Sequence, residues 1–193
     1  DYVTRDTGPK GGPILISGDK SRGTIFKGGT FPQTVGTMAH EFGHGLGLPD
    51  LYDLAYDNPE RDSAGIGKWG LMGQGAPGWN GDDGPNPFCA WSLEQLGWIG
   101  LNNERLVEIR GDTTGLEIAN LYQQGYVYKI PLEPEVIQPG ILSQSYLLLE
   151  QRISNAHHYD RHLPGEGLLI WHIRSRFRDN SDEKSQLVDL ICA

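Results

Sequence analysis

The sequence has few cysteines, a deficit of basic residues and no long hydrophobic run. Its two cysteines, Cys89 and Cys192, lie far apart in a chain of 193 residues, which argues against a small fold held by several disulfides. The 16 Lys and Arg residues are scattered and outnumbered by 25 Asp and Glu, for a net charge of -9, so nucleic acid is not an expected partner. The longest apolar runs, such as 146–149 and 168–172, fall far short of the roughly 20 residues of a membrane span.

Glycine and proline, by contrast, are abundant. The 27 Gly and 12 Pro predict many loops, whereas 37% hydrophobic and 21% charged residues are typical of a folded chain and not of a disordered one. The chain starts without Met, has no signal peptide pattern, and residues 187–193 look like an interrupted strand. We therefore expect a fragment.

One helix is expected between residues 33 and 46. Apolar residues recur there at three- and four-residue spacing, at Val35, Met38, Ala39, Phe42 and Leu46. Gly47 and Pro49 then supply a left-handed terminator and a residue that cannot continue the helix.

The rest of the chain alternates loops with short elements. We expect a hairpin from 14–17 and 24–27, a long irregular connection over 50–87, and a second helix over 90–96. Strands are then predicted at 106–110, 116–119, 126–132, 145–153 and 167–173. The predicted class is α+β.

The first helix carries the pattern His40-Glu41-Phe42-Gly43-His44. Residues four apart share a helix face, so both imidazoles can turn toward one metal ion. A catalytic zinc site needs a third protein ligand, and Gly47 lets the backbone fold back so that Asp50 reaches the same ion. The predicted zinc ligands are His40, His44 and Asp50.

Glu41 follows His40 and lies about 100° further round the helix. It therefore borders the metal position without pointing at it, which suits a general base acting on a metal-activated water. Such a pair hydrolyses peptide bonds without a covalent intermediate. Two alternatives for the ligands remain open: Glu94 on the second helix could be the third ligand, and an inert helix could carry two incidental histidines.

The segment HEFGHGLGLPDLYD, residues 40–53, resembles the immune inhibitor A (M6) family of bacterial zinc metallopeptidases, which is similar to the metzincins. Residues 67–73 (GKWGLMG) and 90–99 (AWSLEQLGWI) resemble the segments around that family's Met-turn. YLLLEQR, residues 146–152, and LPGEGLLIWHI, residues 163–173, resemble its closing strands.

This resemblance implies a metzincin-like catalytic fragment with an active-site helix, a long Gly-rich loop and a β-rich C-terminal part. Residues 1–100 would be the zinc-binding part, lacking its N-terminal portion, and 101–193 the truncated β-rich part. Met72 would be the Met-turn residue beneath the metal.

The resemblance further implies a secreted enzyme with a polypeptide substrate. It also allows structural calcium in the acidic loops, which hold Asp50, Asp53, Asp57, Asn58, Glu60, Asp62, Asn80, Asp82, Asp83 and Asn86. The competing functional hypotheses are a non-enzymatic binding or adhesion module and a truncated peptidase fragment that is catalytically incompetent.

Overall fold

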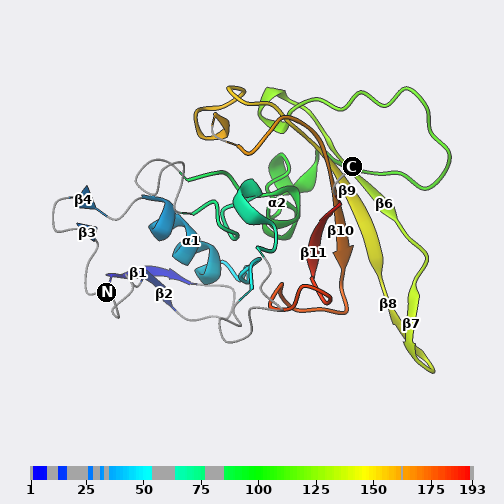
Figure 1. Cartoon of the computed structure of the whole chain (residues 1–193), viewed down its shortest axis with the longest axis horizontal. Coiled ribbons are helices and arrows are strands. Elements are labelled where there is room, and N and C mark those ends of the chain that lie inside the picture. Colours follow the sequence, from blue (N-terminus) through cyan, green and yellow to red (C-terminus); the bar gives the residue numbers. More distant parts are fainter. Residues whose placement is uncertain are drawn as a thin grey trace.

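A computed structural model describes residues 2–7, 13–16, 26–27, 31–32, 35–53, 64–76, 85–161 and 163–191 (Figure 1). Its helices are α1 (Val35–Gly45) and α2 (Ala90–Leu96). Its strands are β1 (Tyr2–Thr7), β2 (Pro13–Ile16), β3 (Phe26–Lys27), β4 (Phe31–Pro32), β5 (Leu106–Glu108), β6 (Val127–Pro131), β7 (Glu135–Gln138), β8 (Ile141–Ser143), β9 (Ser145–Arg152), β10 (Gly167–Arg174) and β11 (Val188–Ile191).

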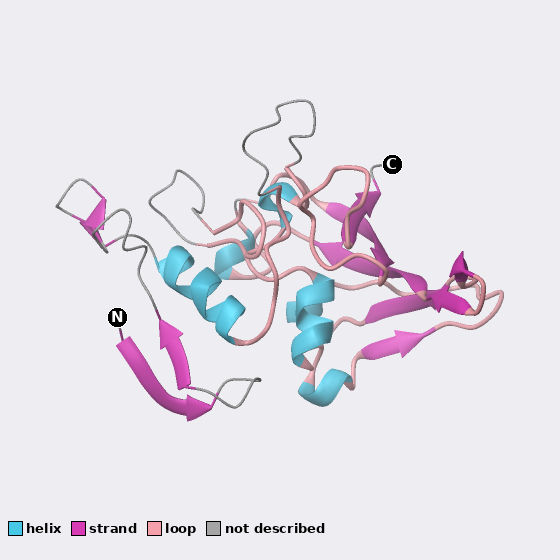
Figure 2. Cartoon of the chain, turned by 90° about the horizontal axis from the view of Figure 1, so that it is seen from below, coloured by secondary structure: helices cyan, strands magenta, loops and turns pink. Residues whose placement is uncertain are grey.

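The largest sheet has five strands in the order β11-β10-β9-β6-β5. Its strands pair antiparallel except for β5 and β6, which are parallel. Strands β1 and β2, β3 and β4, and β7 and β8 form three separate antiparallel pairs. In Figures 1 and 2, α2 lies between α1 and this sheet, and α1 also contacts β2.

Both helices end in the same way, by a glycine with a positive φ. Gly47, with φ 99°, follows α1, and the Leu48 N–H then donates to the Gly43 carbonyl at 3.1 Å. Gly97, with φ 74°, follows α2, and the Trp98 N–H donates to the Leu93 carbonyl at 2.8 Å. These six-to-one bonds define Schellman motifs, which turn the chain sharply out of each helix.

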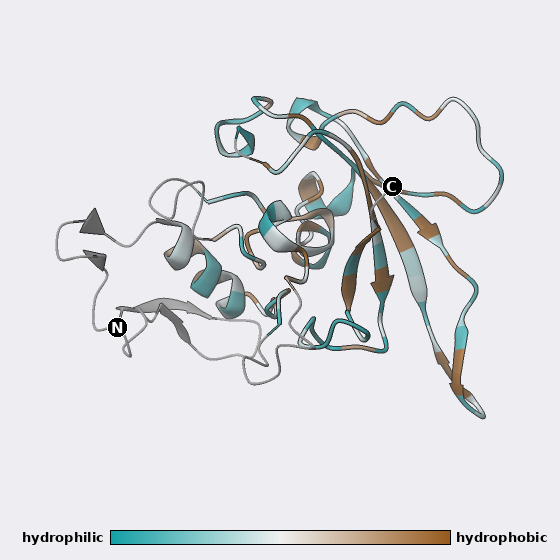
Figure 3. Ribbon diagram, viewed as in Figure 1, coloured by the Kyte–Doolittle hydropathy of each residue, from teal (hydrophilic) through white to brown (hydrophobic). Residues whose placement is uncertain are grey.

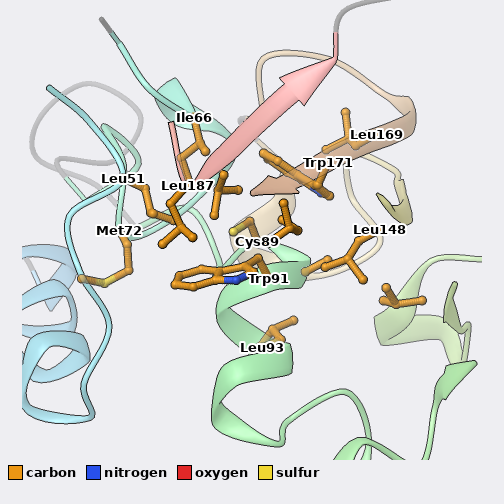
Figure 4. Close-up of a cluster of buried hydrophobic side chains, with 14 of the residues drawn as sticks. Leu51, Ile66, Met72, Cys89, Trp91, Leu93, Leu148, Leu169, Trp171 and Leu187 are labelled. Carbon is orange, nitrogen blue, oxygen red and sulfur yellow. The ribbon is translucent and has the colours of Figure 1, made fainter. Parts of the chain in front are cut away.

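The hydrophobic core lies between the sheet, α2 and the loops that follow α1. Figure 3 shows hydrophobic residues along β9 to β11 and hydrophilic turns on α1. The core residues, some of them drawn in Figure 4, come from both sides of residue 100: Leu48, Leu51, Ile66, Met72, Cys89, Ala90, Trp91, Leu93, Ile99, Leu121, Val127, Tyr146, Leu148, Leu169, Trp171, Ile173, Leu187 and Val188.

A buried ionic network ties the sheet to the start of α2. Arg152 is 1% exposed; its guanidinium forms ion pairs with Glu150 at 2.7 Å and Asp160 at 3.0 Å. Its Nη2 also donates to the Phe88 carbonyl at 2.6 Å. Glu150 Oε2 accepts the Ala90 N–H at 3.2 Å. A buried charge is tolerated only when it is paired in this way.

Most of the predicted elements are confirmed, and the class is α+β. The predicted hairpin of 14–17 with 24–27 is wrong, because β2 pairs with β1. Residues 116–119 form no strand. The β7–β8 hairpin was not predicted. The metzincin-like fold and the division at residue 100 stay predictions. Among the described residues, no helix has the length and hydrophobicity needed to cross a membrane.

Replacement of Arg152 by Ala should lower the free energy of unfolding by about 3–5 kcal/mol, because two buried carboxylates lose their partner. The matched control is Arg176→Ala, which removes a half-exposed ion pair with Glu135 and should cost no more than about 1 kcal/mol. Urea unfolding followed by Trp fluorescence measures both. Equal losses in the two variants would contradict the role given to the buried network.

Candidate metal centre

Helix α1 presents two imidazoles toward one carboxylate. His40 Nε2 lies 3.0 Å and His44 Nε2 lies 3.3 Å from the same oxygen, Asp50 Oδ1. The two rings are almost perpendicular, with centroids 4.7 Å apart. The structure therefore brings together the three residues that the sequence predicts as ligands, and it does so through the turn at Gly47.

Backbone carbonyls determine which ring nitrogens face the centre. His40 Nδ1 lies 2.8 Å from the Leu71 carbonyl oxygen, and His44 Nδ1 lies 2.8 Å from the Leu48 carbonyl oxygen. A carbonyl can only accept, so each Nδ1 carries the hydrogen and donates it. Both Nε2 atoms are left facing Asp50, as a pair of metal ligands requires.

The electrostatics of the centre favour a cation. Burial alone would raise the pKa of Asp50. When the two rings are doubly protonated, however, each Nε2–H also donates to Asp50, and these bonds outweigh burial and hold that pKa well below its usual range. The hydrogen bond that His44 then donates to Asp50 raises the pKa of His44 despite partial burial. The carboxylate thus stays ionised, and a positive charge between it and the two rings is stabilised.

The donor set fits a zinc ion. Two ligand atoms on a tetrahedral zinc lie about 3.4 Å apart, close to the 3.0 and 3.3 Å found between Asp50 Oδ1 and the two Nε2 atoms. The side chain of His40 is 8% exposed and that of His44 is 33% exposed, so the centre opens to solvent on the His44 side. An open side is what separates a catalytic zinc site from a structural one.

Glu41 is half-buried and adjoins His40 on α1. Its negative charge is one of the causes that raise the pKa of His44. The carboxylate therefore belongs to the electrostatic surroundings of the centre without being one of the three converging groups.

Met72 lies against α1 between the turns that carry the two histidines. The residue is fully buried, and Figure 4 shows its side chain reaching toward the pale blue helix, which is α1. Gly43 makes this contact possible, because a Cβ at that position would come within 2.5 Å of Met72 Sδ. The thioether thus lies under the helix, where the resemblance to the M6 family places the Met-turn residue.

Glu94, the alternative third ligand, has partners elsewhere. Its Oε1 pairs with Lys129 Nζ at 2.7 Å, and its Oε2 accepts the Tyr146 hydroxyl at 2.7 Å. Burial and this bond to Glu94 raise the pKa of Tyr146 far above its usual range. Both carboxylate oxygens are thus engaged by the sheet, and Asp50 takes the place beside the histidines.

The calcium hypothesis falls mostly outside the described residues, since 54–63 and 77–84 lie there. Asn86 is described and is fully buried, with its Nδ2 donating to the Lys68 carbonyl at 2.6 Å. Calcium therefore stays a prediction. Within the described part of the chain, His40, His44 and Asp50 form the one group of three or more metal-binding side chains.

Two groups that shape this centre were not predicted. The carbonyls of Leu48 and Leu71 orient the imidazoles, but a backbone oxygen leaves no signature in the choice of residue. Leu48 directly follows the turn at Gly47, and this position could have indicated that its carbonyl lies near His44. Nothing in the sequence near His40 indicates Leu71, which lies 31 residues later.

A model of a known protein family matches part of the chain. The model of the immune inhibitor A peptidase M6 catalytic domain matches residues 29–102. This segment holds α1, Asp50, Met72 and α2. The strands that we likened to the family, β9 and β10, lie beyond it.

Among curated proteins, the chain is similar to the pre-pro-metalloprotease PrtV of two strains of Vibrio cholerae serotype O1. Identity is 35% over 78 residues, which cover 37% of this chain and 8% of the relative. The chain thus spans a small part of the length of these relatives. No solved structure matches it significantly. The resemblance to the M6 metallopeptidases that the histidine motif predicted is therefore confirmed over this segment.

Proposed function

We propose that this chain contains the metal-binding part of a zinc-dependent endopeptidase. His40, His44 and Asp50 hold the ion, and Glu41 is the general base. Residues 1–100 form the zinc-binding part of the catalytic domain, and 101–193 form its β-rich C-terminal part. The observation that carries the proposal is the convergence of both Nε2 atoms on Asp50 Oδ1, at 3.0 and 3.3 Å.

Each residue has a distinct task in this proposal. The hydrogen bonds from each Nδ1 to a backbone carbonyl keep the two Nε2 lone pairs directed at one point. A zinc ion held there would lower the pKa of a water molecule enough for attack at neutral pH and would polarise the substrate carbonyl. Glu41 takes a proton from the attacking water and returns it to the leaving amine. Asp50 stays ionised because its pKa is lowered.

The relatives suggest the setting of this reaction. The matched Vibrio cholerae protein is named a pre-pro-metalloprotease. By analogy we propose a secreted protein that acts on polypeptides, with structural calcium as an additional cofactor. The metzincin-like architecture is part of the same proposal, and the close approach of Met72 to Gly43 of α1 supports it.

Zinc content tests the proposed metal ligands. The wild-type chain should retain one equivalent of zinc after dialysis, and His44→Ala should retain almost none, because two ligands do not hold zinc firmly. His158→Ala removes an exposed histidine and should leave the zinc content unchanged. Elemental analysis with and without chelator gives the stoichiometry. A wild-type chain that folds without zinc would favour the non-enzymatic module.

Replacement of Glu41 separates metal binding from catalysis. Glu41→Gln should keep its zinc but cleave casein at least about a hundredfold more slowly, since a positioned base contributes about 10²–10⁴ in rate. Glu166→Gln changes an exposed carboxylate and should be as active as the wild type. Retained turnover in Glu41→Gln would refute the assigned base. A zinc-loaded wild-type chain without turnover would instead identify an incompetent fragment.

The zinc affinity of the centre should depend on pH. Asp50 raises the pKa of His44 above the ordinary value of 6.5, and zinc binds only the unprotonated ring. Protons therefore compete below that raised pKa, while Asp50 remains ionised. The apparent zinc affinity, measured against a chelating dye from about pH 8 to about pH 5.5, should fall by about tenfold or more per pH unit at the acid end. A flat profile would contradict the assignment of His44.

A further inference from the structure

The residue after Asp50 is fixed by three hydrogen bonds. Leu51 is fully buried, and its N–H donates to the Met72 carbonyl at 2.8 Å. Its own carbonyl accepts the Ile66 N–H at 2.9 Å and a longer bond, 3.4 Å, from Asn180 Nδ2. The position of Asp50 therefore depends on groups that lie far from α1 in the sequence.

Asn180 comes from the connection between β10 and β11, and its side chain is fully buried. Its Nδ2 donates to the Val188 carbonyl at 2.6 Å, and its Oδ1 accepts the Val188 N–H at 3.0 Å. The amide is thus held flat against the first residue of β11. Because both Oδ1 and Nδ2 are bonded to Val188, the amide has little rotational freedom, and the second hydrogen of Nδ2 remains directed at the Leu51 carbonyl.

We infer that Asn180 is a positioning residue for the metal centre, through which the β10–β11 connection fixes the carboxylate of Asp50. The inference rests on the proposed function. Zinc–ligand distances vary by only about 0.2 Å between good sites. A small shift of the Leu51 carbonyl would therefore move the neighbouring Asp50 carboxylate enough to weaken zinc binding. Leu51 and Leu187 both belong to the hydrophobic core cluster, so packing contributes to holding the two segments as well.

The hydrogen bond from Asn180 to the Leu51 carbonyl joins the C-terminal part of the chain to the segment that follows α1. Asn180 lies outside the segment 29–102 that matches the M6 model, whereas Leu51 and Asp50 lie within it. The sheet thus contributes to the metal centre without supplying a ligand. A purely structural role for Asn180, limited to fastening β11, would leave the ligand geometry unchanged when the amide is removed.

Replacement of Asn180 by Ala in the full chain tests this difference. Zinc affinity, measured by competition with a chelating dye, should fall about tenfold, as is usual when a group that supports a ligand is lost. The absorption bands of the cobalt(II)-substituted protein should change in position and intensity, because they report the geometry of the ligands. Asn180→Asp has the same shape but lacks the donor, and it should change both readouts in the same direction.

Val127→Ala is the matched control. Val127 is fully buried in β6 and its N–H donates to the Arg105 carbonyl, away from Leu51. This variant should lose stability but keep the zinc affinity and the cobalt spectrum of the wild type. Wild-type affinity and spectrum in Asn180→Ala would overturn the inference.

The unsubstituted chain gives a second test that does not depend on variants that fold. Coupling is reciprocal, so zinc binding should slow hydrogen exchange at the Leu51 and Val188 amides more than at the Val127 amide. Unchanged exchange at Val188 would overturn the inference. A wild-type chain that binds no zinc would refute the proposed function, and this inference with it.

Discussion

The candidate centre depends on two hydrogen bonds from imidazole to backbone. Each Nδ1–H donates to a carbonyl, Leu71 for His40 and Leu48 for His44. A ring that turned over would direct a hydrogen away from its acceptor and leave a buried carbonyl unpaired, which costs about 1–3 kcal/mol. The two bonds therefore fix both the tautomer and the direction of each ring, and the convergence on Asp50 follows.

The acceptor of His40 is itself held by the sheet. The Leu71 N–H donates to the Pro87 carbonyl at 3.0 Å. The next residue, Phe88, offers its carbonyl to Arg152 in the buried ionic network. A continuous series of contacts thus runs from β9 to His40, while Asn180, in the connection before β11, donates to the Leu51 carbonyl next to Asp50. The β-rich part is in this sense a support for the helix that carries the histidines.

The sequence predicts those features whose signal is local. Spacing and capping residues located α1 and α2, and the Gly47 turn placed Asp50 beside the histidines. The turn residues at 18–21 favoured a hairpin of 14–17 with 24–27, but β2 pairs with β1, which precedes it at a similarly short distance. Turn residues on one side of a strand do not decide between two candidate partners. The β7–β8 hairpin had a usable signal in Pro139-Gly140 between apolar residues. Asn180 had none, since nothing near it in the sequence points to Leu51.

Position 43, in the turn of α1 between the two histidines, has little room for a side chain. In the spelling His-Glu-x-x-His the fourth position is formally free, yet in this chain a methyl group at Gly43 would meet Met72 Sδ, which is itself enclosed by the core. A larger residue there would require the fully buried Met72 or the helix itself to move. Packing against the core therefore restricts position 43, although its residue contributes no side chain to the centre.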